Sequence, residues 1–376
     1  MTLTGIDVLA RGRFAALNGS RVGLVTNHTG QTQSGQTTID ALFSAPGVAL
    51  TALFGPEHGI RGDFDQPAVA DSTDAQTGLP VYSLYGARTQ PAAEQLADID
   101  TLAFDIQDIG CRFYTYLSTL GHILEAAQTH GKRVVVLDRP NPITAMHTEG
   151  PLADRDKLAF VACYPIPIRH GLTFGEMARL LHAEKGLTCP LEVIACEGWR
   201  RGDWYDETGL LWTNPSPNMR RLSAAALYPG VGLLEMTNVS VGRGTDTPFE
   251  VFGAPYVDAC AFTAALNAER LPGVRFVPVQ FTPTASVFAG ETCGGIQILV
   301  LDREALDAVR VGLTLALTLR RLYREAWQPE KLMTLLVNQK TYDAIMAGQS
   351  YPDMAADWAK DLEEFGNRAQ TWRLYE

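Results

Sequence analysis

The sequence lacks the loops by which most nucleotide-dependent enzymes are recognised. No Gly-x-Gly-x-x-Gly fingerprint follows the first apolar segment, where residues 27–30 read Asn-His-Thr-Gly, and no Gly-Lys-Ser/Thr phosphate loop occurs. A Gly-x-Ser-x-Gly nucleophile elbow is missing too. These absences argue against a Rossmann dehydrogenase, a P-loop NTPase and a serine hydrolase.

Cysteine pairs and dense positive charge are also scarce. The six cysteines among 376 residues form no Cys-x-x-Cys motif, which argues against a zinc knuckle or a dithiol redox site. A net charge of −11 repels phosphate polymers, and no Lys/Arg run with interleaved aromatics offsets it, so we expect no nucleic-acid partner. The densest basic pairs, Arg220-Arg221 and Arg320-Arg321, are explained adequately as solvated or locally paired residues.

No apolar run has the length of a membrane span. The nearest, residues 296–301, ends at Asp302, so we expect no membrane partner. Residues 1–20 lack the apolar core of a signal peptide, which predicts a cytoplasmic protein for the chain as given. A trimmed leader would instead imply a secreted or periplasmic protein.

The chain does contain the alternation that is typical of an α/β fold. With 46% hydrophobic and 19% charged residues it has the composition of a globular protein with ample core, and its length favours two domains. In the first half, strand-like segments alternate with helix-like ones, which predicts a mostly parallel sheet with helices on both faces. The expected strands are 21–27, 48–54, 80–85, 101–106 and 133–138, and the expected helices are 38–44, 91–96, 114–130 and one that opens at Thr173.

A second, smaller α/β unit is expected after residues 253–255. We therefore divide the chain into an N-terminal domain, 1–254, and a C-terminal domain, 255–376. The second unit should hold a helix over 258–269, strands over 274–281 and 295–302, and a long helix over 305–327. Just before it, the Pro- and Asn-rich segments 212–218 and 228–230 are typical of ordered loops that wall a cleft.

The most informative segment is Phe-Gly-Pro-Glu-His-Gly-Ile-Arg-Gly at residues 54–62. It follows an apolar run typical of a strand buried on both faces, and Gly55-Pro56 then breaks the strand and turns the chain outward. Glu57 and His58 are thus expected at the carboxyl end of a strand, where open α/β sheets bind their ligands.

Three other predicted strands also end in polar residues. Asn27 follows the first, Asp105 and Asp108 close another, and Asp138 ends the next. Any one of these clusters alone is explained by a turn or a helix cap. In a parallel sheet, however, all of them would meet at one edge, and this convergence predicts an active site there.

The residue types at this edge suit the acid/base cleavage of an acetal such as a glycosidic bond. That reaction needs a protonated carboxyl group for the leaving oxygen and a second group for water or the ring cation. Glu57 is our candidate for the acid. The further candidates are the catalytic residues His58, Asp105, Asp108 and Glu250, and the substrate-binding residues Asn27, Arg61, Arg112, Tyr114, Tyr116, His170, Asn218 and Arg243.

A metal site is the competing interpretation of the same edge. Its ligands would be His28, His58, Asp105, Asp108 and His170. They would have to come from separate loops, because no His-x-x-x-His or Glu-x-x-His spacing exists, and we therefore expect no metal.

Glu250 lies among apolar, proline and glycine residues. A carboxylate in such surroundings is either paired or functional, since an unpaired buried charge is costly. Arg243 is the expected partner if Glu250 is paired.

Five motifs together resemble the family of NamZ-type exo-β-N-acetylmuramidases. They are Phe-Gly-Pro-Glu57-His58-Gly-Ile-Arg61-Gly, Asp105-Ile-Gln-Asp108-Ile-Gly-Cys-Arg112-Phe-Tyr114-Thr-Tyr116, Asp138-Arg-Pro-Asn-Pro, Trp212-x-x-Pro-Ser-Pro-Asn218 and Gly242-Arg243-Gly-Thr-x-x-Pro-Phe-Glu250-x-x-Gly-Ala-Pro. The resemblance runs in the same order from about Gly5 to Tyr375.

The resemblance implies a Rossmann-like N-terminal domain and a smaller α/β C-terminal domain, with the site in the cleft between them. It also implies release of N-acetylmuramic acid from the non-reducing ends of peptidoglycan fragments, without a cofactor. Glu57 matches the glutamate of the family's Gly-Pro-Glu-His motif. One of Arg61, Arg112 and Arg243 would bind the lactyl carboxylate of the sugar.

The expected partner is therefore a small sugar or muropeptide. Two alternatives stay open: a non-catalytic sugar-binding protein that kept the cleft, and a metal-assisted hydrolase. The oligomeric state and the stereochemical outcome are left open by the sequence.

Overall fold

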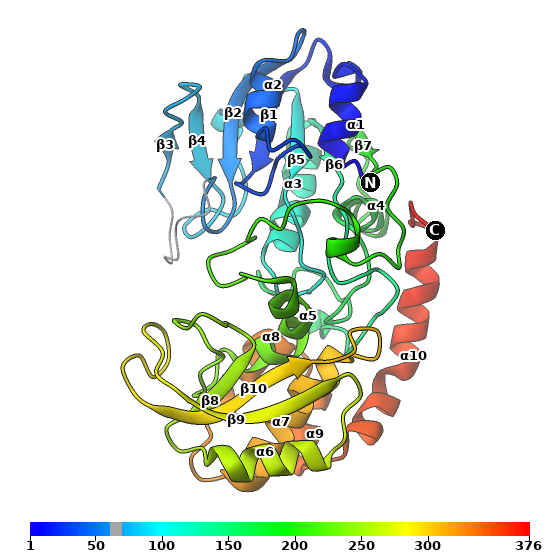
Figure 1. The fold of residues 1–376 in the computed structure, drawn as a ribbon. Coiled ribbons are helices and arrows are strands. Elements are labelled where there is room, and N and C mark those ends of the chain that lie inside the picture. The colour runs from blue at the N-terminus through cyan, green and yellow to red at the C-terminus, as the bar shows by residue number, and fades with distance from the viewer. Residues whose placement is uncertain (61–69) are drawn as a thin grey trace.

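The computed structural model describes residues 1–60 and 70–376, and it contains a seven-stranded sheet and a three-stranded sheet (Figure 1). The larger sheet has the order β3-β4-β2-β1-β5-β6-β7, and every neighbouring pair is parallel except β3 and β4. Its strands are β1 Arg21–Thr26, β2 Ala49–Gly55, β3 Ser72–Thr73, β4 Pro80–Ser83, β5 Thr101–Asp105, β6 Arg133–Leu137 and β7 Leu191–Ile194. The expected α/β class with a mostly parallel sheet is confirmed.

Helices cover both faces of this sheet, as the apolar strands require. Side chains alternate between the faces, so Leu24 belongs to one buried cluster and Val25 to the other. The first cluster packs under α1 Gly5–Arg11 and α2 Thr38–Phe43. The second packs under α3 Tyr116–His130 and α4 Phe174–Glu184. Both faces are buried, which explains why the strands are continuous apolar runs.

The chain reverses its direction of winding at β1, which lies between β2 and β5. Thr26 pairs with Asp105 and Val25 pairs with Phe54, so these strands end at the same level. The predicted meeting of their carboxyl ends at one edge is therefore correct. Such a switch point is the usual ligand site of a doubly wound sheet.

The second sheet is antiparallel, in the order β8-β10-β9. Its strands are β8 Val251–Ala254, β9 Val274–Phe281 and β10 Cys293–Val300, and the helices around it are α5 Leu222–Val231, α6 Ala259–Ala268, α7 Ala308–Leu322, α8 Met333–Leu336 and α9 Gln339–Ala347. β8 lies on the N-terminal side of the division expected after residue 254, yet it pairs with β10. The sheets themselves therefore do not divide at that residue.

Helices α5 and α7 approach each other closely at two glycines. A Cβ atom built on Gly230 would lie 1.7 Å from the Ala308 carbonyl oxygen, and one on Gly312 would lie 2.2 Å from the Gly230 carbonyl oxygen. Only glycine fits this backbone contact. It fixes α5 against the core of the second unit.

The last helix, α10 Tyr351–Gln370, leads from the second unit back to the first sheet, beside which the chain ends (Figure 1). There the Tyr375 hydroxyl donates a hydrogen bond to Asp138 Oδ2 at 2.5 Å and accepts one from the Cys196 amide at 2.9 Å. The C-terminal residues thus join the two units through partly buried polar contacts.

Some predicted elements differ in kind or length. Segment 91–96 holds a short 3₁₀ helix, Ala93–Leu96, and the helix expected over 305–327 spans only α7. Asp307 sets the start of α7 by accepting a hydrogen bond from the Arg310 amide. In the described parts of the chain we find no helix that is both long and apolar enough to cross a membrane.

Candidate active site

Glu57 lies in the turn that ends β2. The Gly59 amide closes this turn on the Pro56 carbonyl at 2.9 Å, and His58 has a positive φ of 71°, a conformation that is uncommon for residues other than glycine. Glu57 is half-buried, and the Thr115 hydroxyl donates a hydrogen bond to its Oε2. The side chain is thus held at the carboxyl edge of the sheet, where the sequence placed it.

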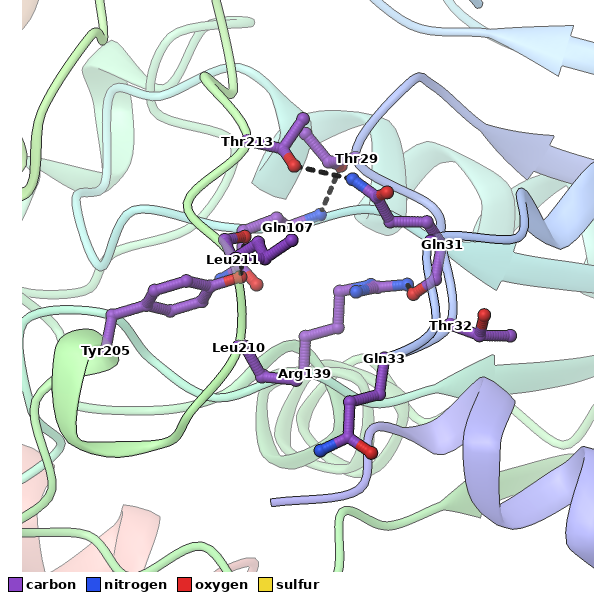
Figure 2. Close-up of a pocket in the computed structure, with 11 residues that line it drawn as sticks. Thr29, Gln31, Thr32, Gln33, Gln107, Arg139, Tyr205, Leu210, Leu211 and Thr213 are labelled. Carbon is purple, nitrogen blue, oxygen red and sulfur yellow. Dashed lines mark hydrogen bonds between the residues drawn. The ribbon is translucent and has the colours of Figure 1, made fainter. Parts of the chain in front are cut away.

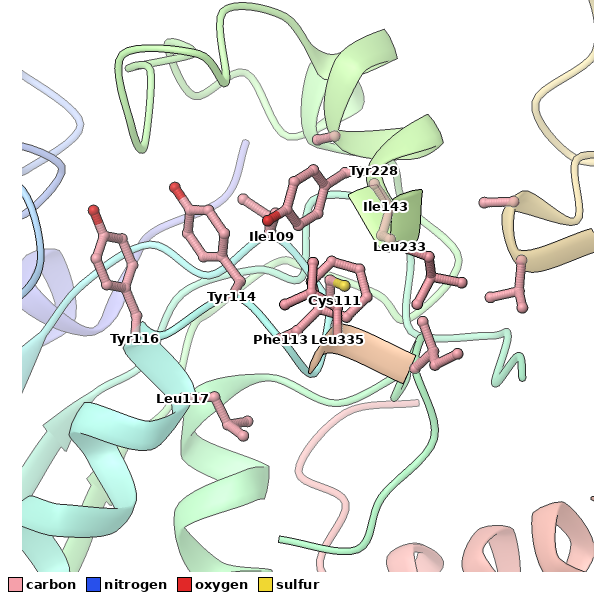
Figure 3. Packing of buried hydrophobic residues seen from close by; sticks show 14 of the residues in the cluster. Ile109, Cys111, Phe113, Tyr114, Tyr116, Leu117, Ile143, Tyr228, Leu233 and Leu335 are labelled. Atoms are coloured by element: carbon pink, nitrogen blue, oxygen red, sulfur yellow. The ribbon is translucent and has the colours of Figure 1, made fainter. Parts of the chain in front are cut away.

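Three buried tyrosines form a cluster near this carboxylate. The ring centroids of Tyr114 and Tyr116 are 4.9 Å apart, those of Tyr114 and Tyr228 are 5.9 Å apart, and Figure 3 shows the hydroxyls of Tyr114 and Tyr116 pointing to the same side. Burial raises the pKa of all three hydroxyls, and the nearby charge of Glu57 raises it further. The hydroxyls therefore stay protonated and can act as hydrogen-bond donors.

The segment 212–218 lies over the ends of β1 and α3. The Tyr116 hydroxyl donates to the Pro215 carbonyl at 2.7 Å, and Gln31 Nε2 donates to Thr213 Oγ1 at 2.5 Å. His28 Nε2 lies 2.6 Å from the Asn214 carbonyl oxygen. This loop forms one wall beside the tyrosines, and Asn218 is buried at its end.

Arg243 approaches the tyrosines from the second unit. Its guanidinium lies 5.9 Å from the centre of the Phe249 ring, which in turn packs on Tyr228 with centroids 4.7 Å apart. Arg243 also forms an ion pair with Glu235. The charge of Arg243 lowers the pKa of Tyr228, although burial dominates, so the guanidinium is close to the tyrosine cluster.

Arg112 is not at the site, which corrects the prediction that it binds substrate. Its guanidinium is fully buried and donates four hydrogen bonds, to the carbonyls of Pro151, Ile166, Leu335 and Leu336. Burial lowers its pKa to about 10. Arg112 therefore fastens α8 to the first unit and cannot reach a sugar. Arg61, the other predicted arginine, lies outside the described residues.

Asp105 is also occupied by structural contacts. Its Oδ1 accepts from Arg139 Nε at 2.5 Å, and its Oδ2 accepts from Arg139 at 3.0 Å and from the Thr38 hydroxyl. The side chain is fully buried. A carboxylate with both oxygens bound in this way is a poor acid or base, so the geometry does not favour the catalytic role that the sequence predicted.

Asp108 differs from Asp105 although it is only three residues away. Its Oδ2 accepts from the Gly110 amide at 3.0 Å and lies 3.1 Å from His170 Nε2. The Leu172 amide donates to His170 Nδ1, which places the ring proton on Nε2, facing Asp108. Its Oδ1 is buried and receives no hydrogen bond from the described residues. The structure thus brings the predicted residues Asp108 and His170 into contact.

Glu250 is paired, but not with the expected Arg243. It accepts a hydrogen bond from the Ser223 hydroxyl, and its other oxygen lies 3.4 Å from Arg221 Nη1. Arg243 turns instead to Glu235. The partner could not be read from the sequence, because the start of α5 brings Arg221 and Ser223 against β8 only in the folded chain.

Little space remains at the switch point between β1 and β5. Figure 2 shows Tyr205, Leu210 and Leu211 facing Gln31 and Arg139 across a cavity of about 20 Å³. That volume holds about one water molecule. The segment 205–213 therefore fills the crevice that a nucleotide takes in other doubly wound folds.

The five residues of the metal interpretation do not form a ligand set. Over residues 1–60 and 70–376, no three His, Cys, Asp or Glu side chains are arranged so that they could hold an ion. Asp105 is bound to Arg139, and His170 Nε2 lies 3.1 Å from the Asp108 carboxylate.

Sequence reasoning missed two residues of the site. Thr115, which lies between two tyrosines in the sequence, was not identified. It immediately precedes α3, and its hydroxyl donates a hydrogen bond to Glu57. Glu235 was not singled out in the sequence. No local signal marks it, because its partner Arg243 comes from another loop.

The structure is a doubly wound α/β protein with a second, smaller domain. A half-buried glutamate and aromatic hydroxyls at the carboxyl edge of its sheet are of the types that suit a carbohydrate site. Family models described as the N-terminal and C-terminal parts of exo-beta-N-acetylmuramidase NamZ match residues 22–223 and 226–375. The chain therefore belongs to the NamZ family, and the resemblance noted in its motifs is confirmed.

A comparison with individual proteins supports the same family assignment. The peptidoglycan beta-N-acetylmuramidase NamZ of Bacillus subtilis (strain 168) is 41% identical over 378 aligned residues, covering 99% of this chain and 91% of that protein. Two DUF1343 family proteins of Bacteroides fragilis NCTC 9343 have similar crystal structures. The first has a TM-score of 0.87 at 38% identity, and the second has a TM-score of 0.83 at 27% identity. Each comparison covers 100% of this chain and 99% of the Bacteroides chain.

Proposed function

We propose that this protein is an exo-acting glycoside hydrolase that releases N-acetylmuramic acid from the non-reducing ends of peptidoglycan fragments. Membership of the NamZ family and the named activity of the Bacillus relative support this reaction. The observation that carries it here is the placement of Glu57, half-buried and bound by Thr115, at the carboxyl edge of the sheet and near a cluster of three buried tyrosines.

Glu57 acts as the general acid in this proposal. Glycosidic cleavage needs a proton on the departing oxygen, and Thr115 fixes the orientation of the carboxyl group that delivers it. Tyr114, Tyr116 and Tyr228 offer protonated hydroxyls and ring faces, which suit the hydroxyls and the apolar face of a pyranose.

Asp108 is our candidate for the second catalytic carboxylate. Both oxygens of Asp105 and of Glu250 are bound by neighbouring side chains, whereas Oδ1 of Asp108 receives no hydrogen bond from the described part of the chain. His170 and the Gly110 amide would hold Asp108 in a fixed orientation. A group of this kind can activate water or stabilise the ring cation.

Arg243 is our candidate for binding the lactyl carboxylate that distinguishes muramic acid from glucosamine. It is a guanidinium next to the tyrosine cluster, while Arg112 is buried elsewhere. Guanidinium groups bind carboxylates through two parallel hydrogen bonds. Arg61 remains a second candidate from the sequence.

The deciding experiment compares Glu57→Gln with the parent on a chromogenic β-N-acetylmuramoside. We expect turnover to fall roughly 10²–10⁴-fold, because the amide cannot donate the proton. Glu94→Gln, an exposed glutamate in the same half of the chain, should keep full activity.

Each other outcome contradicts part of the proposal. Equal release by parent and Glu57→Gln would remove Glu57 from the chemistry. Binding without release by the parent would favour a sugar-binding protein. Loss of the parent's activity on exhaustive chelation, restored by a divalent metal, would favour a metal-assisted hydrolase.

A further inference from the structure

The basic pair Arg320-Arg321 and a third arginine, Arg310, line a cavity on the side of α7 that faces away from α5. Gly312 on α7 packs against α5, while residues 310, 314, 317 and 321 lie on another face of the same helix. The cavity has a volume of about 540 Å³, within the range of small-molecule sites. The end of α6 and the turn between α9 and α10 form its other walls.

The charged lining of this cavity is mostly positive, although the chain as a whole carries −11. Arg320 donates to the Met346 carbonyl at 3.1 Å, and Arg321 lies 3.8 Å from Glu269, the one acidic residue of the lining. A positive cavity in an acidic protein concentrates anions.

Arg310 is the arginine that is still available. Its guanidinium lies 5.3 Å from the centre of the Tyr351 ring, and its buried Nε has no hydrogen-bond partner among the described residues. The nearby Asp307 does not occupy it through side-chain bonds. One Asp307 oxygen accepts from the Arg310 amide at 2.8 Å and the other from the Tyr351 hydroxyl at 2.6 Å.

The spacing along α7 indicates how a ligand would lie. Arg310 and Arg321 are separated by 11 positions, which is about 16 Å of helix, so the two side chains cannot share one small anionic group without bending toward each other. Between them lie Thr314 and Leu317, a hydroxyl and an apolar side chain. This order suits an elongated polar molecule with its charge at the Arg310 end.

We propose that this cavity is a second binding site, which takes a sugar-sized organic anion with a phosphate or carboxylate group at Arg310 and its hydroxylated body along Thr314 and Leu317 toward Arg321. Phosphate and carboxylate share the oxyanion chemistry that a guanidinium recognises. The site is independent of Glu57 and of the proposed glycosidase activity.

Calorimetric titration of the full-length protein with glucose 6-phosphate, glucuronate and uncharged glucose tests the site. We expect one site for at least one of the two anions and none for glucose. Arg310→Ala should weaken binding at least about tenfold, because a charge-assisted contact is lost. Arg321→Ala should weaken it less, and Arg324→Ala, an exposed arginine just beyond α7, should leave it unchanged.

Three controls keep the result interpretable. Glu57→Gln should bind the anion with unchanged affinity, which separates this cavity from the catalytic edge. Arg310→Lys keeps the charge and the contact with Tyr351 but loses the planar fork, so it should bind more weakly even if Arg310→Ala proves unstable. Turnover of the chromogenic substrate by Arg321→Ala should equal that of the parent in the absence of anion.

Binding of glucose 6-phosphate alone would identify a phosphorylated ligand, and binding of glucuronate alone a carboxylated one. The proposal is overturned if neither anion binds, if glucose binds equally well, or if Arg310→Ala and Arg310→Lys both bind with the affinity of the parent.

Discussion

Two stretches of the same sheet edge carry carboxylates after buried strands, and the fold uses them differently. At the end of β2, Glu57 stays half-buried beside tyrosine hydroxyls. At the ends of β5 and β6, Asp105 and Asp138 are fully buried and bound on both oxygens. The sequence signal is the same, namely an apolar run followed by an acidic residue.

The difference lies in what the neighbouring segments supply. Arg139 follows β6 directly and reaches Asp105, while the chain terminus brings Tyr375 to Asp138. The turn after β2 instead meets α3, which offers the neutral Thr115. A carboxylate at a strand end is therefore evidence for a functional site only when its oxygens are not already bound by a neighbouring cation or by several hydrogen-bond donors.

The largest effect on stability should follow from breaking the Asp105 to Arg139 pair. Asp105→Ala leaves a buried guanidinium without its counter-charge, so the free energy of unfolding should fall by about 3–5 kcal/mol. Denaturant titration measures this change. Asp98→Asn, an exposed carboxylate just before β5, should change it little.

Glu57→Gln should give the opposite result. It should leave the free energy of unfolding nearly unchanged while turnover falls roughly 10²–10⁴-fold. A stability loss for Glu57→Gln as large as that for Asp105→Ala would erase the distinction between the two stretches.

A smaller effect should appear in the pH dependence of stability through Asp138. Burial raises the pKa of this carboxyl to about 6 from 3.8, and the repulsion from Glu176 adds to the rise, although Tyr375, Thr173 and the Gly175 amide oppose it. Between pH 3.8 and about 6 the folded protein keeps a proton that the unfolded chain has released. The contribution of Asp138 is therefore fully present below pH 3.8 and is lost as the pH rises through about 6, by about 3 kcal/mol.

Asp138→Asn cannot titrate, so its stability should lack this fall. The measurement is the difference in the free energy of unfolding between parent and variant at pH 4 and at pH 7. A difference that does not change between these two pH values would contradict the buried environment assigned to Asp138.

The smallest expected effect separates two tyrosines, Tyr114 and Tyr375. Tyr114→Phe removes a hydroxyl beside the proposed acid, so kcat/KM should fall about tenfold with little change in unfolding. Tyr375→Phe removes the donor to Asp138, so it should lower stability by about 1–2 kcal/mol and leave the kinetics nearly intact. The reverse pattern would place the chain terminus, not Tyr114, at the chemistry.

Much of the fold could be predicted because its signals are local. Strand β9 was located to the residue. Helix α4 begins at Phe174, directly after Thr173, whose side chain accepts from the Glu176 amide in the expected capping box. Strand β8, in contrast, is not marked by a local sequence signal. It depends on pairing with β10, about 40 residues later, and nothing within 251–254 reveals that partner.

The candidate site, like the fold, was predictable only where a local sequence signal marks a residue. Glu57, Asp108 and His170 were found from their positions next to strand ends and motifs, and the structure places the last two in one pair. Arg112 was misjudged because a sequence motif does not show whether a guanidinium points to a ligand or to four carbonyl groups inside the protein.

The amino-acid sequence by itself determined the alternation of strands and helices, the turn that carries Glu57 and the family to which the chain belongs. These follow from periodicity and from short motifs, which act over a few residues. Only the tertiary structure decided which carboxylates stay available, since Arg139, Arg221 and Tyr375 reach their acidic partners from positions 29 to 237 residues away. Charge neutralisation in a folded core depends on distance in space, and distance along the chain does not encode it.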